Sequence, residues 1–293
     1  LKVAALIFLF GVIFLSGKGS VHNLTAASPN FDHSSWHQLT AFIAATTGAL
    51  AAYDGWNNLG FIGGEIRNPQ KNIPRGLIIG LLLCILLYVL TTEAYLYMMP
   101  VDEMKKSPLV ASDALYKIMG VGGGGLVAAL VLLSTAGATN SNILPCARVV
   151  FAMSHEKNFF EFAGKVNKMY HTPSNALWFQ AAWATILVLI GSFDMLMDMF
   201  VFITWIFYGF AAYGIFILRK RNPDAKPAYR LKGYPVLPVI FILFSTLYVV
   251  ITLYNDISDY AAGRSHVIVS VLGLALACLG IPLYWYFNKR QLR

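Results

Sequence analysis

Long apolar runs separated by short polar loops make up this chain. Crossing the hydrocarbon core of a bilayer takes about 20 mostly apolar residues. The candidate segments are 1–16, 39–64, 76–99, 123–152, 174–191, 195–218, 236–254 and 266–287. This pattern predicts an all-α integral membrane protein with about eight helices. The first segment is too short to cross, and we interpret it as the end of a longer helix because the chain starts with Leu1 rather than Met.

The composition favours a membrane protein over the other classes compatible with a basic chain. Hydrophobic residues make up 57% of the chain and charged residues only 12%, with a mean hydropathy of +0.61. Soluble domains carry about 25% charged residues. The net charge of +8 comes mainly from short loops between apolar runs, which favours contact with anionic lipid over nucleic acid. Cys84, Cys146 and Cys278 lie far apart in apolar segments, so we expect neither a disulfide framework nor a metal cluster.

The basic residues also predict the orientation of the chain. Loops rich in Lys and Arg face the cytoplasm. Most of these residues fall within 67–75, 148–168, 219–232 and 289–293. We therefore expect a multi-pass protein of the cytoplasmic or plasma membrane, with these loops and both chain ends in the cytoplasm. Residues 17–38 would form an extracellular loop and residues 219–235 a cytoplasmic connector.

The most informative stretch is the run from Ala51 to Asn58, Ala-Ala-Tyr-Asp-Gly-Trp-Asn-Asn, inside the segment 39–64. A carboxylate at membrane depth is costly and marks a functional site by default. Because Gly55 follows Asp54, we expect the helix to unwind over residues 51–57, which is tolerated only beside a protein cavity. Carbonyls at the end of the first half-helix would lose their partners and face an ammonium group or another cation. The residues in question are Ala51, Ala52 and Tyr53, with Asn57 nearby. Alternatively, Asp54 only bonds a neighbouring helix and fixes packing.

Other polar or aromatic residues in apolar segments are weaker candidates. Segment 123–152 carries a polar stripe, which close helix packing explains as well as a solute pathway does. Its members include Ser134, Thr135 and Asn140. Lys2 would extend its ammonium group to the membrane interface, and Trp205 is either a core aromatic or a gate. No metal-ligand spacing, nucleophile motif or cofactor motif occurs, so we expect no enzymatic activity, metal or cofactor.

Four stretches resemble one known family. The string Ala-Tyr-Asp-Gly-Trp-Asn-Asn-Leu-Gly-Phe at 52–61, followed by Gly-Glu-Ile-Arg-Asn-Pro-Gln-Lys-Asn-Ile-Pro-Arg at 64–75, is specific. It resembles the sixth span and next loop of amino-acid permeases of the amino acid–polyamine–organocation superfamily, in particular L-type exchangers and their bacterial relatives. Residues 134–156, 202–205 and 219–235 are similar to the family's eighth span, tenth span and following connector. The resemblance covers nearly the whole chain.

The resemblance implies a leucine-transporter-like fold, in which two inverted repeats of five helices enclose a site at the membrane midplane. Residues 1–16 would end the fifth span, residues 39–218 would form the second repeat, and residues 236–288 would form two peripheral helices. The first four spans would be missing, and the complete site needs them because the first span binds the substrate carboxylate in this family. Lys2 falls close to a family lysine that substitutes for a sodium ion.

We therefore predict a sodium-independent secondary transporter that moves amino acids by alternating access, as exchange or uptake. The implied substrate-binding residues are Ala51, Ala52, Tyr53, Asp54, Gly55, Asn57 and Trp205, with Lys2, Ser134, Thr135 and Asn140 as coupling or structural polar residues. The family's carriers of dibasic amino acids and cystine match Asp54 better than its neutral-preferring exchangers do, which makes a cationic side chain a hypothesis. The alternatives are a truncated fragment or structural partner that transports nothing, transport of another organic cation or amine, and cation–chloride cotransport.

Overall fold

Every regular element is a helix in the part of the chain that the computed structural model describes, which comprises residues 2–25, 34–61, 63, 66–224, 231 and 233–291. Several predicted features lie partly outside these residues. They are the outer loop at 26–33, the end of the segment 39–64 at 62 and 64, and the connector at 225–230 and 232; residue 65 lies outside as well. Residues 1, 292 and 293 also lie outside.

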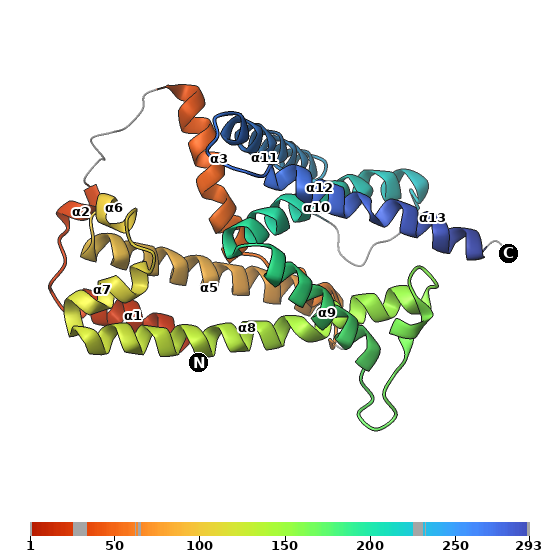
Figure 1. The fold of residues 1–293 in the computed structure, drawn as a ribbon, viewed down its shortest axis with the longest axis horizontal. Helices are drawn as coiled ribbons and strands as arrows, with labels where there is room; N and C mark the ends of the chain where they lie inside the picture. The colour runs from red at the N-terminus through yellow and green to blue at the C-terminus, as the bar shows by residue number, and fades with distance from the viewer. Residues whose placement is uncertain are drawn as a thin grey trace. The chain divides into compact units, whose positions relative to one another are not determined.

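The helices follow one another along the chain, and Figure 1 labels most of them. In order they are α1 (Lys2–Leu15), α2 (His22–Thr25), α3 (Ser35–Ala52), α4 (Asn58–Phe61), α5 (Pro69–Met98), α6 (Val101–Met104), α7 (Val110–Met119), α8 (Val121–His155), the 3-10 helix η2 (Glu161–Gly164), α9 (Ser174–Ile190), α10 (Phe193–Arg221), α11 (Val236–Ala261), α12 (Val269–Cys278) and α13 (Gly280–Gln291).

Five helical stretches in the described residues are long and apolar enough to cross a membrane. They are α5, α8, α10, α11 and Val269–Phe287, which joins α12 to α13. α1 and α9 are apolar but shorter, with 14 and 17 residues, and α3 does not reach the same apolarity over a full span. Among the described residues, the predicted segments 39–64 and 174–191 thus do not contain a helix that meets this length and apolarity, and 1–16 is short, as the sequence predicts.

Two helix boundaries differ from the sequence-based prediction. α5 begins at Pro69 rather than near residue 76, because a proline is favoured in the first turn, where its missing N–H has no helical partner to lose. α8 begins at Val121 and continues through Pro145 to His155. Its four glycines, 122–125, therefore lie in the first turns of the helix.

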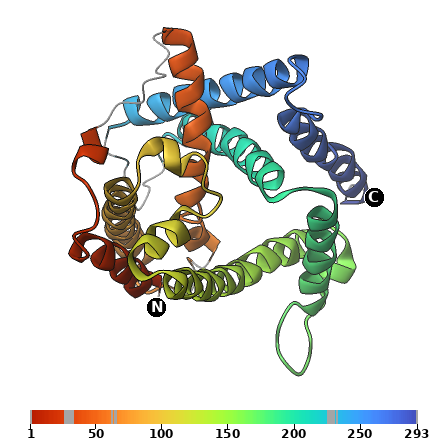
Figure 2. The ribbon, with the colours of Figure 1, turned by 60° about the vertical axis from the view of Figure 1, so that its left-hand side comes forward.

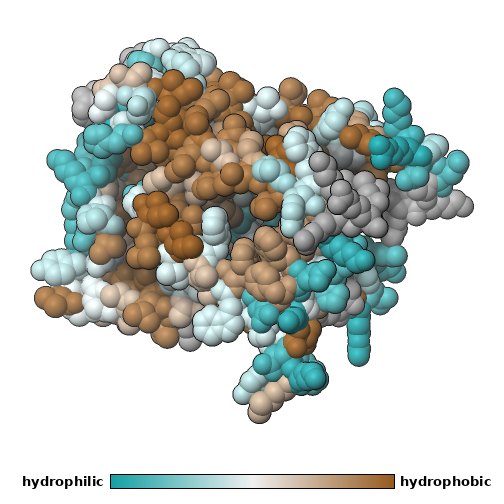
Figure 3. Space-filling view, turned by 45° about the vertical axis from the view of Figure 1, so that its right-hand side comes forward, coloured by the Kyte–Doolittle hydropathy of each residue, from teal (hydrophilic) through white to brown (hydrophobic). Residues whose placement is uncertain are grey.

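Large apolar side chains cover much of the surface. On α5, Ile79, Leu82 and Leu86 follow one another at helical spacing and are 66%, 61% and 55% exposed. Figure 3 shows broad apolar areas on the face in view. Soluble monomers rarely expose contiguous apolar surface on this scale, whereas lipid tails accommodate it. The exposed helix faces therefore agree with a multi-pass membrane protein.

The chain forms two compact units. The first comprises residues 1–32 and 62–145. Its core joins α1, α5, α7 and the start of α8, and α1 lies against α5 in both ribbon views (Figures 1 and 2). The buried residues of this core are Leu9, Ile13, Ala94, Met98, Met99, Ala114, Leu115 and Val127. Outside the core, the Lys18 ammonium group donates to the Ile118 carbonyl near the end of α7 at 3.0 Å.

The second unit comprises residues 33–61 and 146–293, and it contains the stretch around Asp54. α10 packs along α11 and α12, and α3 packs against both α10 and α11. The buried core of this contact consists of Ile43, Val201, Tyr248 and Ile251. Close approach of α12 to α10 depends on Gly273, because a Cβ there would lie only 2.7 Å from the Met199 side chain. This packing holds the first half of the predicted broken helix.

Candidate functional site

The polypeptide leaves the helical conformation between α3 and α4. α3 ends at Ala52, and α4 begins at Asn58. Gly55 has φ +101°, a backbone conformation that residues with a Cβ rarely adopt. The turn closes through a hydrogen bond from the Asn58 amide to the Gly55 carbonyl at 3.2 Å. The glycine beside the aspartate is thus the residue that permits the change of chain direction.

The Ala51 carbonyl at the end of α3 is not unpaired, which corrects the expectation from the sequence for this residue. The Ala51 carbonyl accepts a bond from the Asp54 amide at 3.2 Å, and the Tyr53 amide donates to the Ala49 carbonyl at 3.0 Å. Ala52 and Tyr53 also have interacting partners. A tightened last turn satisfies helix-end carbonyls in this way. Because a carbonyl oxygen has two lone pairs, the Ala51 oxygen keeps the capacity to accept a second bond.

The Asp54 side chain is held by α10. The Tyr208 hydroxyl donates to Asp54 Oδ1 at 2.9 Å. Across the turn, the Trp56 ring lies 5.3 Å from the Tyr208 ring between centroids, within the range of attractive aromatic contacts. Asp54 is half-buried. One tyrosine of α10 therefore contacts residues on both sides of Gly55.

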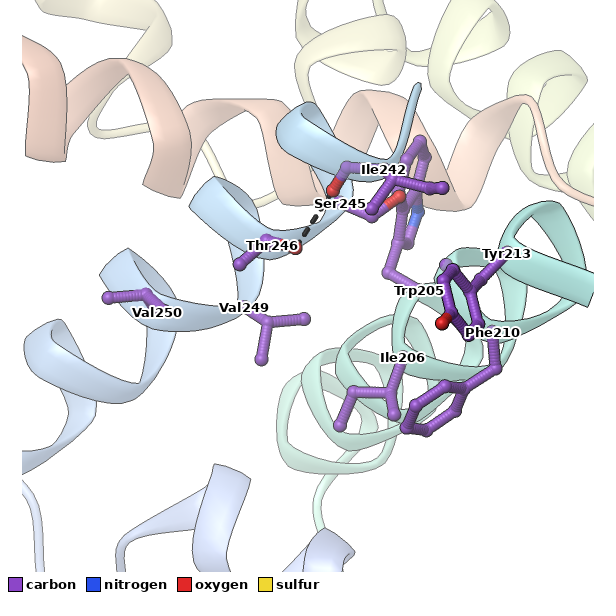
Figure 4. Close-up of a pocket in the computed structure, with 10 residues that line it drawn as sticks. Trp205, Ile206, Phe210, Tyr213, Ile242, Ser245, Thr246, Val249 and Val250 are labelled. Carbon is purple, nitrogen blue, oxygen red and sulfur yellow. Dashed lines mark hydrogen bonds between the residues drawn. The ribbon is translucent and has the colours of Figure 1, made fainter. Parts of the chain in front are cut away.

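Trp205 lies one turn before Tyr208 on α10, with ring centroids 6.1 Å apart. Its indole stacks on Phe241 at 5.5 Å and contacts Tyr248 at 5.8 Å, so α11 supports it. It also lines a cavity of about 260 Å³ between α10 and α11 (Figure 4). The other lining residues are Ile206, Gly209, Phe210, Tyr213, Ile242, Ser245, Thr246, Val249 and Val250. Trp205 thus lies between the Asp54 contact and an almost wholly apolar cavity.

Comparison with known proteins identifies the family. The profile of the family described as Amino acid permease matches residues 1–277. The chain belongs to this family. Its members are transporters rather than enzymes, and exchangers are among the relatives of this chain.

Relatives of this chain occur in bacteria and in animals. The chain is 34% identical over 283 residues to the serine/threonine exchanger SteT of Bacillus subtilis (strain 168), covering 96% of this chain and 61% of that protein. It is 30% identical to the b(0,+)-type amino acid transporter 1 of Mus musculus, covering 83% of this chain and 48% of that protein. The human cystine/glutamate transporter is 27% identical, with 92% and 50% covered. The chain thus spans between about half and three fifths of the length of these relatives.

The other predicted polar residues of the permease lie in the first unit. A Cβ added to Gly137 of α8 would lie 3.4 Å from Lys2 Cε and 4.0 Å from Lys2 Nζ. The end of the Lys2 side chain therefore lies beside this glycine of α8. On the same helix Ser134 is half-buried, whereas Thr135 and Asn140 are exposed. The Thr135 carbonyl accepts a bond from the Thr139 hydroxyl at 3.0 Å. These residues belong to a different unit from Asp54.

Two tyrosines of the second unit were not among the residues predicted from the sequence. Tyr208 contacts Asp54 as described. The Tyr248 hydroxyl, which is fully buried, shares a hydrogen bond of 3.0 Å with the Thr47 hydroxyl of α3. The signal for Tyr208 is its spacing of three residues from Trp205, which places both on one face of a helix. In the residues that the structure describes, no group of three or more His, Cys, Asp and Glu side chains could hold a metal ion.

Proposed function

We propose that this chain is the part of a secondary transporter that contains its broken helix, and that the transporter carries amino acids by alternating access. The observation that carries the proposal is the non-helical turn at Tyr53–Asn57, which holds Asp54, in a family of amino acid permeases. Lipid cannot satisfy the backbone of such a turn, so it needs a protein-lined cavity. In transporters, discontinuous helices of this kind bind substrates and coupling ions.

The chemistry of the turn favours an amine. The Asp54 carboxylate pairs with the substrate ammonium group, and the C-terminal end of α3 adds the negative end of its helix dipole. Ala51, Ala52 and Tyr53 contribute carbonyl oxygens at that end, while Gly55 and Asn57 shape the turn. Trp205 forms the aromatic wall of the same site. A solute without a cationic nitrogen leaves Asp54 without a charged partner, and this cost provides the selectivity.

The proposal includes the fold and orientation of the complete protein. Residues 39–218 form the second repeat of a leucine-transporter-like fold, and residues 236–288 form two peripheral helices. Residues 1–16 end the fifth span, and four further spans supply the first repeat and the carboxylate subsite. The loops rich in Lys and Arg face the cytoplasm. Because this chain spans about 61% of SteT, the proposal concerns a full-length permease that contains the chain.

The test is uptake of labelled amino acids by that full-length permease in proteoliposomes. Asp54→Asn keeps the size of the side chain and removes its charge, so uptake falls by about tenfold or more while the amount of protein in the membrane stays unchanged. A parallel fall in uptake and protein amount would instead assign Asp54 to packing. Competition by each common amino acid identifies the side-chain class. Stronger competition by amines that lack a carboxylate would favour the alternative of an organic cation transporter.

A second candidate follows from the coverage of the relatives. The chain matches only about half the length of several transporters, which favours a fragment that transports nothing when it is alone. Reconstitution of the chain alone beside the full-length permease separates the two. Uptake by the full-length protein only would place the function in the complete protein, whereas absence of uptake from both would reject the transporter proposal.

A further inference from the structure

Tyr208 is in the right place to fix the conformation of the broken helix. It is the sixteenth of the 29 residues of α10, which puts it about 22 Å along the helix at 1.5 Å per residue. Since the hydrocarbon core of a bilayer is about 30 Å thick, Tyr208 lies near the middle of the span. Its contact with Asp54 therefore occurs at the depth where water is scarce and a fixed polar partner matters most.

The contact restrains the turn on both sides of Gly55. The Tyr208 hydroxyl donates to Asp54 Oδ1 at 2.9 Å, and its ring contacts the Trp56 ring at 5.3 Å. Gly55 itself, at φ +101°, belongs to the residue type with the greatest backbone freedom. Without outside contacts, the turn would sample several conformations. Tyr208 supplies the contacts that select one of them.

The contact also leaves Asp54 able to bind a ligand. A carboxylate has two oxygens with about four lone-pair sites, and Tyr208 bonds only Oδ1. The hydroxyl therefore orients the carboxylate and stabilises its charge without exhausting its acceptors. Trp205 backs Tyr208 from the preceding turn of α10, and Trp205 stacks in turn on Phe241 of α11. The orienting group is thus held by packed aromatic side chains.

We propose that Tyr208 is the positioning residue of the broken helix. Its hydroxyl orients the Asp54 carboxylate toward the substrate amine, and its ring fixes Trp56, so that the turn is already in its binding conformation when the substrate arrives. The role rests on the proposed function, because it presumes that Asp54 contacts the substrate. Pre-organisation of this kind lowers the cost of ordering on binding.

The experiment is a double-mutant cycle in the full-length permease, with KM and kcat for uptake measured for Tyr208→Phe, Asp54→Ala and the double variant. Tyr208→Phe keeps the ring and loses only the hydroxyl. A bond to a charged group corresponds to a factor of about ten or more, so KM rises about tenfold while kcat changes by less than about threefold. In the Asp54→Ala background, the same change alters KM by less than about twofold. Tyr254→Phe, on a half-exposed tyrosine of α11, leaves KM unchanged.

If Asp54→Ala abolishes uptake, the unfolding temperatures of the same variants replace KM in the double-mutant cycle. Tyr208→Phe lowers the unfolding temperature in the parent protein and leaves it unchanged in the Asp54→Ala variant. Additive effects of the two substitutions, or a KM of Tyr208→Phe equal to that of Tyr254→Phe, would overturn the positioning role while the transporter proposal stands. A parent protein that takes up no amino acid would overturn both.

Discussion

Tyr248→Phe removes a single hydroxyl from the centre of the second unit and isolates its partner on α3. The Tyr248 ring is fully buried and the Thr47 side chain nearly so, at 9% exposure, and their hydroxyls lie 3.0 Å apart. A buried polar group that loses its partner costs about 1–3 kcal/mol. Thr47 can turn its hydroxyl back to a carbonyl of its own helix, which places the expected loss for Tyr248→Phe near 1 kcal/mol.

A second substitution removes the other hydroxyl of this hydrogen bond, that of Thr47. Thr47→Val leaves the fully buried Tyr248 hydroxyl with only the Thr252 hydroxyl as a neighbouring side-chain partner in the described residues, with an expected loss of about 2 kcal/mol. The double variant places two apolar side chains of unchanged shape against each other, which is nearly neutral. The two single losses therefore do not add, and the coupling energy is about 3 kcal/mol.

The assay is thermal unfolding of the purified full-length permease in detergent. For folded units of roughly 200 residues, 1 kcal/mol corresponds to about 2–4 °C. Tyr248→Phe and Thr47→Val thus lower the midpoint by about 2–4 °C and 4–8 °C, and the double variant recovers most of the loss. Tyr254→Phe is the matched control. A double variant whose midpoint falls by the sum of the single shifts would refute the assignment of this bond as a support of α3.

Three further predictions concern other parts of the molecule. Trp205→Ala changes the ranking of competing amino acids because it removes the aromatic wall beside Tyr208; an unchanged ranking contradicts its role in the site. If Lys2 stands in for a sodium ion, uptake persists in sodium-free buffer, and a steep dependence of uptake on sodium would reject that role. Gly123→Ala lowers stability by about 1–3 kcal/mol, because its Cβ would lie 2.5 Å from the Leu115 carbonyl oxygen, whereas Gly125→Ala meets nothing within 4 Å. Equal unfolding midpoints for these two variants would show that the close approach of α7 to α8 does not constrain the helix.

The class of the protein could be predicted from its hydropathy, but the bounds of several helices could not. The all-helical fold and the family agree with the prediction. Eight apolar segments were expected, and five described stretches meet the length and apolarity of a span. The difference arises because α3 ends at Ala52, so that its 18 residues include the polar stretch at 35–38, and because α1 and α9 are short. The hydropathy of a sequence does not show which polar side chains of a helix are covered by neighbouring helices.

The partners of Asp54 lay beyond the reach of the sequence. The adjacent glycine indicates a break in the helix, because a positive φ requires a residue without Cβ. The spacing from Trp205 places Tyr208 on a helix face, but nothing in the local pattern pairs it with Asp54, which is 154 positions away, or pairs Thr47 with Tyr248 across 201 positions. The prediction for the Ala51 carbonyl was wrong because the last turn of α3 tightens and supplies a donor from Asp54 itself.

The most direct measurement is protection of the turn by substrate. In the full-length permease, Asn57→Cys places a thiol in the turn, with the other cysteines replaced, and its rate of modification by a methanethiosulfonate reagent is followed in proteoliposomes. We expect a transported amino acid to slow the modification severalfold at concentrations near its KM, and an amino acid that does not compete for uptake to have no effect. Equal rates with and without a saturating transported amino acid would contradict a substrate site at the broken helix.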